Sequence, residues 1–241
     1  MNSGTAFSRR GLHGQLLNAL GSRIVSGELA AGQIINMEQV QTEFQVSRTV
    51  VREVLRELSA NGLVDARPRY GTFVQERSAW NLLDADVIAW RNAAGPDLRL
   101  LRELSEVRIL VEPGAARLAA EHATAEQLAD IQRALLALEA NYGAALDASI
   151  DADAAFHLGI LRASGNELLE RFEVLLLPAL SVRNAVTLQH SHDRRYLDLH
   201  RTVYDAIAAR DPDASEAALR TLLEEARKDT ETDLAGLLAG A

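Results

Sequence analysis

The first sixty residues carry apolar side chains at intervals of three and four positions, the spacing of helices that bury one face. From Leu12 to Ile24 an apolar residue recurs every four positions, and Gly27 ends this helix because glycine readily adopts the left-handed conformation. A second apolar stripe follows Asn36 and a third follows Ser47, and both residue types cap helices. The pattern predicts three short helices before residue 61.

The helix that follows Ser47 has an apolar inner face and a polar outer face that carries Arg48, Thr49 and Arg52. Two short helices joined by a tight turn are typical of a helix-turn-helix, whose second helix enters the major groove with its N-terminus first. Arginine can donate two hydrogen bonds to guanine, and a threonine methyl can contact thymine. On these residues alone, an ordinary solvated helix face is the alternative interpretation.

Two short segments with strand character follow, residues 63–67 and 72–75, with a turn at Pro68–Gly71 between them. A β-hairpin directly after a recognition helix is a wing. Its tip carries Arg69 and Tyr70, which suit contact with phosphate or with the minor groove.

Beyond residue 76 the strand pattern disappears and helical periodicity continues to the end of the chain. We therefore predict a mainly α protein in three parts. These are a winged helix-turn-helix DNA-binding domain at 1–76, a linker helix at 77–96, and an antiparallel all-helical bundle at 97–241.

Composition and charge support this division. The net charge of −9 argues against nucleic acid, but residues 1–80 hold nine arginines and seven acids whereas the remainder holds 16 basic and 27 acidic residues. The absence of cysteine excludes disulfides and thiolate metal sites, and favours a reducing compartment. No secretion signal and no apolar run of about 20 residues is evident, so we expect a cytoplasmic protein with no membrane contact.

The bundle contains one pattern with chemical potential. Asp153 and His157 are four residues apart and so share a helix face, and His200 follows one helix hairpin later. A carboxylate and two imidazoles in a bundle core form a plausible divalent-metal site, and hydrogen-bonded core histidines are the alternative. Arg108 could hold a ligand carboxylate or pair with Glu112. A metal-dependent enzyme built on the Asp/His group is the competing function, although no nucleotide-binding or hydrolase motif accompanies it.

The segment Val46–Leu55, followed by Gly62-Leu63 and Gly71–Val74, resembles the winged helix of the GntR family of regulators. The resemblance implies a double-stranded, palindromic DNA operator bound by a homodimer. It implies DNA contacts from the start of the third helix and from the wing, namely Ser47, Arg48, Thr49, Arg52, Arg69, Tyr70 and Gly71.

The bundle resembles the FCD ligand-binding domain of the FadR branch of that family, on residues 106–112, 153–157 and 200–207 together with Asn166. In that branch one Asp and three His bind a metal, and organic acids bind beside it. The resemblance implies a Zn, Ni or Mn ion on Asp153, His157 and His200, but Leu222 occupies the fourth ligand position. The effector-binding residues it implies are Arg108, Asp153, His157, Asn166, Arg183 and His200.

Residues 80–90 and 105–113 are also similar to the galactonate-responsive repressors of this branch, which implies a sugar acid as the effector. We therefore expect a repressor of a carbohydrate or organic-acid catabolic operon that a small carboxylate releases from its operator.

Overall fold

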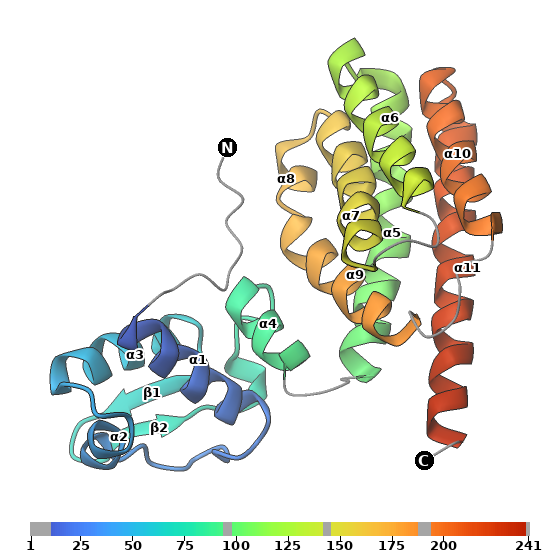
Figure 1. Ribbon diagram of the computed structural model, residues 1–241. Coiled ribbons are helices and arrows are strands. Elements are labelled where there is room, and N and C mark those ends of the chain that lie inside the picture. The colour runs from blue at the N-terminus through green and yellow to red at the C-terminus, as the bar shows by residue number, and fades with distance from the viewer. Residues whose placement is uncertain (1–10, 94–97, 142–145, 188–193, 240–241) are drawn as a thin grey trace. The chain divides into compact units, whose positions relative to one another are not determined.

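The computed structural model describes residues 11–93, 98–141, 146–187 and 194–239, and side chains within 11–93, 99–141, 148–180 and 194–232 (Figure 1). The chain divides into two compact units, Met1–Asp97 and Leu98–Ala241, and each is described by itself. Both are built mainly from helices, as the sequence predicts.

The N-terminal unit begins with three helices that its capping residues delimit. Asn36 accepts hydrogen bonds from the backbone amides of Glu38 and Gln39, and Ser47 accepts one from the amide of Val50. Between these two helices Gln45 has a left-handed backbone (φ 52°), which makes the turn tight. The helices are α1 (Leu12–Val25), α2 (Met37–Phe44) and α3 (Arg48–Ala60).

The predicted wing is present as an antiparallel hairpin of β1 (Val64–Arg67) and β2 (Gly71–Val74). Val64 pairs with Val74 and Arg67 with Gly71, so the pleat directs Val64 and Val74 into the core. Arg69 takes a left-handed φ of 64° at the tip. The hairpin extends directly from α3, which places the wing beside the helix-turn-helix.

The segment after the wing differs from the continuous linker helix expected over 77–96. A 3₁₀ turn, η1 (Arg77–Ala79), comes first, Trp80 is extended (φ −71°, ψ 140°), and the helix α4 (Ala85–Ala93) begins only after Asp84. The side chain of Asp84 accepts the amides of Asp86 and Val87, so it acts as a helix cap. Asp84 falls inside the helix predicted over 77–96, so the sequence pattern does not reveal this start.

The C-terminal unit is the predicted helical bundle. Its central helix, α5, packs against four others, α7, α9, α10 and α11, while α6 packs on α7 and α10 (Figure 1). Thr124 and Gln127 form a capping box at the start of α6. The helices are α5 (Leu98–His122), α6 (Ala125–Ala140), α7 (Leu146–Ala163), α8 (Glu167–Glu170), α9 (Glu173–Thr187), α10 (Arg194–Ala208) and α11 (Pro212–Ala239).

Phe156, Ile160, Val203 and Leu219 are fully buried at the centre of this bundle. No helix within the described ranges combines the length and the apolar character that crossing a membrane requires.

Candidate functional site

The N-terminal unit presents the polar face expected of a recognition helix. Ser47, Arg48, Thr49 and Arg52 are all exposed along the first two turns of α3, while Val51 and Val54 on the opposite face are fully buried. Packing by the buried face fixes the orientation of the helix, and the exposed face remains available to base edges. Ser47 also has a structural role, because its hydroxyl caps α3.

The wing is stiffened by its own aromatic contacts. The rings of Tyr70 and Phe73 meet edge to face with centroids 5.6 Å apart, and the Arg67 guanidinium lies 4.8 Å from the Phe73 centroid. Arg69, Tyr70 and Gly71 are exposed at the tip. A positively charged side chain on a rigid hairpin beside α3 is suited to the DNA backbone.

The C-terminal unit holds a group of ionisable side chains that are almost wholly removed from solvent. Asp153 and His157 come from α7, His200 from α10, and Arg108 and Glu112 from α5, and each is at most 5% exposed. Burial of so many charges is costly unless the groups satisfy one another, so their mutual contacts are informative.

Both histidines lie close to the carboxylate of Asp153. Its Oδ1 lies 3.1 Å from Nε2 of His200 and 3.7 Å from Nε2 of His157, and it also accepts a hydrogen bond from the Tyr196 hydroxyl. The helical spacing of four residues between Asp153 and His157 puts both on the inner face of α7, as the sequence predicts.

The far side of each imidazole has its own partner. Nδ1 of His157 lies 2.7 Å from Oε2 of Glu112, and Nδ1 of His200 lies 2.8 Å from the backbone carbonyl of Tyr196. These acceptors favour a proton on Nδ1. In a neutral imidazole this leaves Nε2, the nitrogen that faces Asp153, free to bind a cation.

Arg108 completes the group through Glu112. Its Nε donates to Oε1 of Glu112 at 2.5 Å, and Nη2 lies 3.4 Å from Oε2. The sequence left open whether Arg108 binds a ligand or pairs with Glu112, and the structure shows the ion pair. Arg108 also borders a small cavity of about 10 Å³ with Ser105, Leu223 and Thr230, which is room for about one water molecule.

Burial and charge act in opposite directions on these groups. Burial alone would raise the pKa of Glu112, but the charges of Arg108 and His157 and their hydrogen bonds lower it from 4.5 to about 2. Burial lowers the pKa of His200, and the hydrogen bond that its protonated Nε2 donates to Asp153 only partly opposes this effect. Glu112 is therefore held ionised by Arg108 and His157, whereas burial favours the neutral form of His200.

The donor set fits a divalent metal ion. Asp153, His157 and His200 offer one carboxylate oxygen and two imidazole nitrogens, all within 4.8 Å of one another and all buried. Two imidazoles oriented by outer acceptors around a carboxylate are the arrangement that Zn, Ni or Mn sites use. Leu222, at the expected fourth position, is an apolar core residue that offers no ligand atom.

Two further residues, Asn166 and Arg183, were expected at the effector site. Asn166 is exposed, and its Oδ1 caps α8 by accepting the amides of Leu168 and Leu169, so the structure gives it a local structural role. Arg183 lies in α9, but its side chain falls outside the described residues. The sequence did not predict that Tyr196 belongs to the buried group, nor that Glu112 contacts His157. A Tyr four residues before His200 was the available signal for the first.

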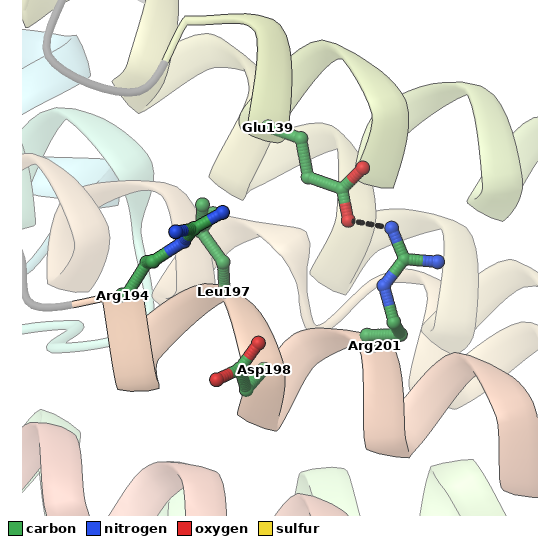
Figure 2. Close-up of a pocket in the computed structure, with 5 residues that line it drawn as sticks. All are labelled: Glu139, Arg194, Leu197, Asp198 and Arg201. Atoms are coloured by element: carbon green, nitrogen blue, oxygen red, sulfur yellow. Dashed lines mark hydrogen bonds and ion pairs between the residues drawn. The ribbon is translucent and has the colours of Figure 1, made fainter.

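A larger pocket of about 430 Å³ lies elsewhere, where α10 meets Glu139 at the end of α6. Figure 2 shows Glu139 joined to Arg201 across it, with Arg194, Leu197 and Asp198 along α10. Its charged side chains are two arginines and two acids, so it offers no net charge that would select a carboxylate.

Comparison with known proteins agrees with this architecture. The family model of bacterial regulatory proteins of the gntR family matches residues 12–74, and the FCD domain model matches residues 103–225. The galactonate operon transcriptional repressor of Escherichia coli is 35% identical over 87% of this chain and 92% of its own length. The transcriptional repressor NanR of Klebsiella aerogenes is 30% identical over 90% of this chain and 84% of its own length.

Solved structures show the same fold. Lar of Listeria monocytogenes superposes with a TM-score of 0.63 at 19% identity, covering 92% of this chain and 98% of that protein. McbR/YncC of E. coli gives a TM-score of 0.55 at 19% identity, covering 93% and 99%. The galactonate operon repressor and NanR are transcriptional repressors, and neither is the metal-dependent enzyme that the sequence left as the competing function. The chain belongs to the GntR family of DNA-binding transcriptional regulators and carries a C-terminal FCD domain.

Proposed function

We propose that this regulator represses an operon for catabolism of a sugar acid or a related organic acid, and that a small carboxylate releases it from DNA. The buried group of Arg108, Glu112, Asp153, His157 and His200 carries this proposal. A helical bundle gains no stability from so many buried charges over apolar packing, so their presence favours a role in binding. The name of the galactonate operon repressor supports the choice of effector class.

On the DNA side, the regulator acts in the cytoplasm as a homodimer on a palindromic operator. One recognition helix reads only a few base pairs, and a two-fold dimer brings two helices to two half-sites. Ser47, Arg48, Thr49 and Arg52 contact base edges and nearby phosphates, while Arg69, Tyr70 and Gly71 contact the backbone from the wing. Sedimentation of the protein with an operator duplex tests this, with two chains per duplex as the expected result and one chain as the contradicting one.

For the effector, Arg108 is the buried cation able to take a carboxylate, because its guanidinium has donors beyond those that Glu112 accepts. The neighbouring cavity of about 10 Å³ must widen to admit a sugar acid. Asp153, His157 and His200 then orient hydroxyl groups or a bound ion. Asn166, which caps α8, and Arg183, whose side chain lies outside the described residues, remain predicted contacts.

Calorimetry with galactonate, gluconate and a simple hydroxy acid tests this assignment. Arg108→Gln should weaken binding by at least about tenfold, as expected for loss of a charge-assisted hydrogen bond. The matched control is Arg201→Gln, which removes an exposed arginine of the same unit and should bind as the wild type does. Tight binding that survives Arg108→Gln, or preference for a neutral ligand, would contradict the assignment.

For the metal, Asp153, His157 and His200 would hold one divalent ion, with water or effector oxygens completing its coordination. When bound, the ion would supply a positive charge that attracts the effector carboxylate or hydroxyls. Elemental analysis of protein purified without chelator tests this, together with thermal shifts on addition of Zn, Ni or Mn. His200→Ala should abolish the shift and His122→Ala, at an exposed histidine, should preserve it. Absence of metal and of any shift in the wild type would contradict it.

A further inference from the structure

We propose that α4 is a fixed part of the DNA-binding unit, and that Asn61 and Asp84 are positioning residues that join it to the end of the recognition helix α3. The covalent path from the effector domain enters the N-terminal unit through residues 94–97 and then Ala93, the last residue of α4. A joint between α4 and α3 would carry any displacement of Ala93 directly to the DNA-reading face.

The joint is centred on one carboxylate oxygen. Oδ1 of Asp84 accepts a hydrogen bond from Nδ2 of Asn61 at 3.1 Å, and also accepts the amides of Asp86 at 3.0 Å and Val87 at 3.1 Å. Asn61 is the residue that ends α3, and Asp84 is the one that starts α4. The same atom therefore connects the C-terminus of one helix to the first turn of the other.

The backbone strengthens this connection. The amide of Asn81 donates to the carbonyl of Asn61 at 3.0 Å, so the intervening segment is bonded to the end of α3. Gly62, next to Asn61, has a left-handed φ of 73°, and a Cβ there would lie 2.1 Å from the carbonyl oxygen of Ala79. The segment before α4 therefore crosses too close to α3 for any side chain at position 62.

The other end of α4 is held by α1. Trp90 is 1% exposed, and its indole donates to Oδ1 of Asn18 at 3.0 Å. A Cβ at Gly21 would lie 2.5 Å from the Trp90 ring, so the indole packs directly on the α1 backbone. Attachment at both ends argues that α4 turns with the DNA-binding unit and that residues 77–84 do not act as its hinge.

A chemical cross-link separates these two possibilities. The chain has no cysteine, so Asn61→Cys/Asp84→Cys introduces the only two thiols, which a short reagent such as dibromobimane can join. If α4 and α3 move together, the cross-linked protein should bind operator and release it on addition of galactonate as the wild type does, within about twofold. If the cross-link blocks release while operator binding persists, the segment is a hinge and the proposal fails.

Removing the hydrogen bond between Asn61 and Asp84 is the complementary test. Asn61→Ala removes the bond to Asp84 but leaves Asp84 able to cap α4, so galactonate should still bind this variant while its effect on operator affinity falls by about three- to tenfold, the value of one hydrogen bond. Thr124→Ala, which removes a helix cap in the other unit, is the matched control and should keep full release. Equal release in wild type and Asn61→Ala would overturn the proposal.

The release measurements rest on the proposed function, but operator affinity without ligand does not. Asn61→Ala should bind operator about three- to tenfold more weakly because α3 is less firmly oriented, and the cross-linked pair should match the wild type. If galactonate fails to release even the wild type, the proposed effector is wrong while this comparison still decides the joint. Unchanged operator affinity in Asn61→Ala would then contradict the proposed joint between α3 and α4.

Discussion

The two units place their charges in opposite ways. In the N-terminal unit Arg48, Arg52 and Arg69 are exposed around an apolar core, and Arg91 is the one buried ionisable residue that the structure describes there. In the C-terminal unit the described buried ionisable residues are Arg108, Glu112, Asp153, His157 and His200.

This difference in the placement of charges follows from the kind of partner that each unit binds. DNA is a polyanion that binds to the outside of a protein, so the side chains that contact it stay hydrated until it binds. A small ligand is enclosed by the protein, so the charges that balance it must lie in the interior. Exposed charges cost the fold little, but buried ones must be balanced by each other when no ligand is bound. Substitutions in the two units should therefore have opposite consequences for stability and for binding.

The largest effect on stability should come from Arg108→Met, which leaves the buried carboxylate of Glu112 with only His157 to balance it. Loss of one partner from a buried pair costs about 3–5 kcal/mol. Urea unfolding followed by far-UV circular dichroism measures it. Tryptophan fluorescence should change less, because Trp80 and Trp90, the two tryptophans of the chain, both lie in the N-terminal unit.

The control for this comparison is Arg201→Met. Arg201 pairs with Glu139 at the surface, where an ion pair contributes at most about 1 kcal/mol. Equal losses of stability in the Arg108 and Arg201 variants would show that the buried pair is no more important than an exposed one.

The largest effect on DNA binding should come from Arg52→Ala, with Arg48→Ala close to it. Loss of a base contact costs about 1–3 kcal/mol of operator affinity, while the free energy of unfolding should hardly change because both side chains are exposed. Fluorescence anisotropy with an operator duplex and with a scrambled duplex measures both affinity and specificity. Wild-type affinity in both variants would remove these residues from the interface.

Acidification should weaken the metal-free C-terminal unit in two steps. Burial lowers the pKa of His200, so the unfolded chain binds its proton more readily and stability falls as the pH drops below about 6.5. Glu112 has its pKa lowered to about 2 from 4.5, so its contribution is present above about 4.5 and is lost between these values.

Urea midpoints at pH 7 and pH 5 test the first step, since Glu112 stays ionised at both. His200→Asn should reduce the difference between the two midpoints. The described residues of the N-terminal unit include no buried histidine, so tryptophan fluorescence of that unit should respond less. A midpoint that is the same at both pH values in the wild type would contradict the assignment to His200.

The smallest effect is expected at the wing. Arg69→Gly removes the guanidinium but keeps the left-handed turn, so it should weaken binding to specific and scrambled duplexes alike. The dependence of log affinity on log salt should become shallower by about 1, as for one lost phosphate contact. A loss confined to the specific duplex would show that Arg69 reads bases instead.

Local signals explain why the fold was predictable from the sequence. Asn36, Ser47 and Thr124 each accept a hydrogen bond from an amide within three residues, so their capping roles are visible in a short window. Asp84 is a cap of the same kind, but helical periodicity on both sides concealed it. The family resemblance assigns Asn166 to the effector, whereas its position predicts a helix cap, and the structure shows the cap at the start of α8.

The candidate site was only partly predictable because its contacts are not local. Asp153 and His157 share a helix face at a spacing of four, which the sequence displays directly. The contact of His157 with Glu112 spans 45 residues and depends on α5 and α7 lying side by side, which no sequence spacing records. Whether Arg108 pairs with Glu112 likewise depended on side-chain orientation rather than on sequence.

One measurement tests the central claim, that the buried group of the C-terminal unit senses a small carboxylate on behalf of the N-terminal unit. Operator affinity of the wild-type protein is measured by anisotropy at rising galactonate concentration, with gluconate and a neutral sugar in parallel. A sugar-acid effector should weaken operator binding by about 5–150-fold, and DNA should weaken the effector by the same factor. Operator affinity that no sugar acid changes, with or without added Zn, Ni or Mn, would contradict the account.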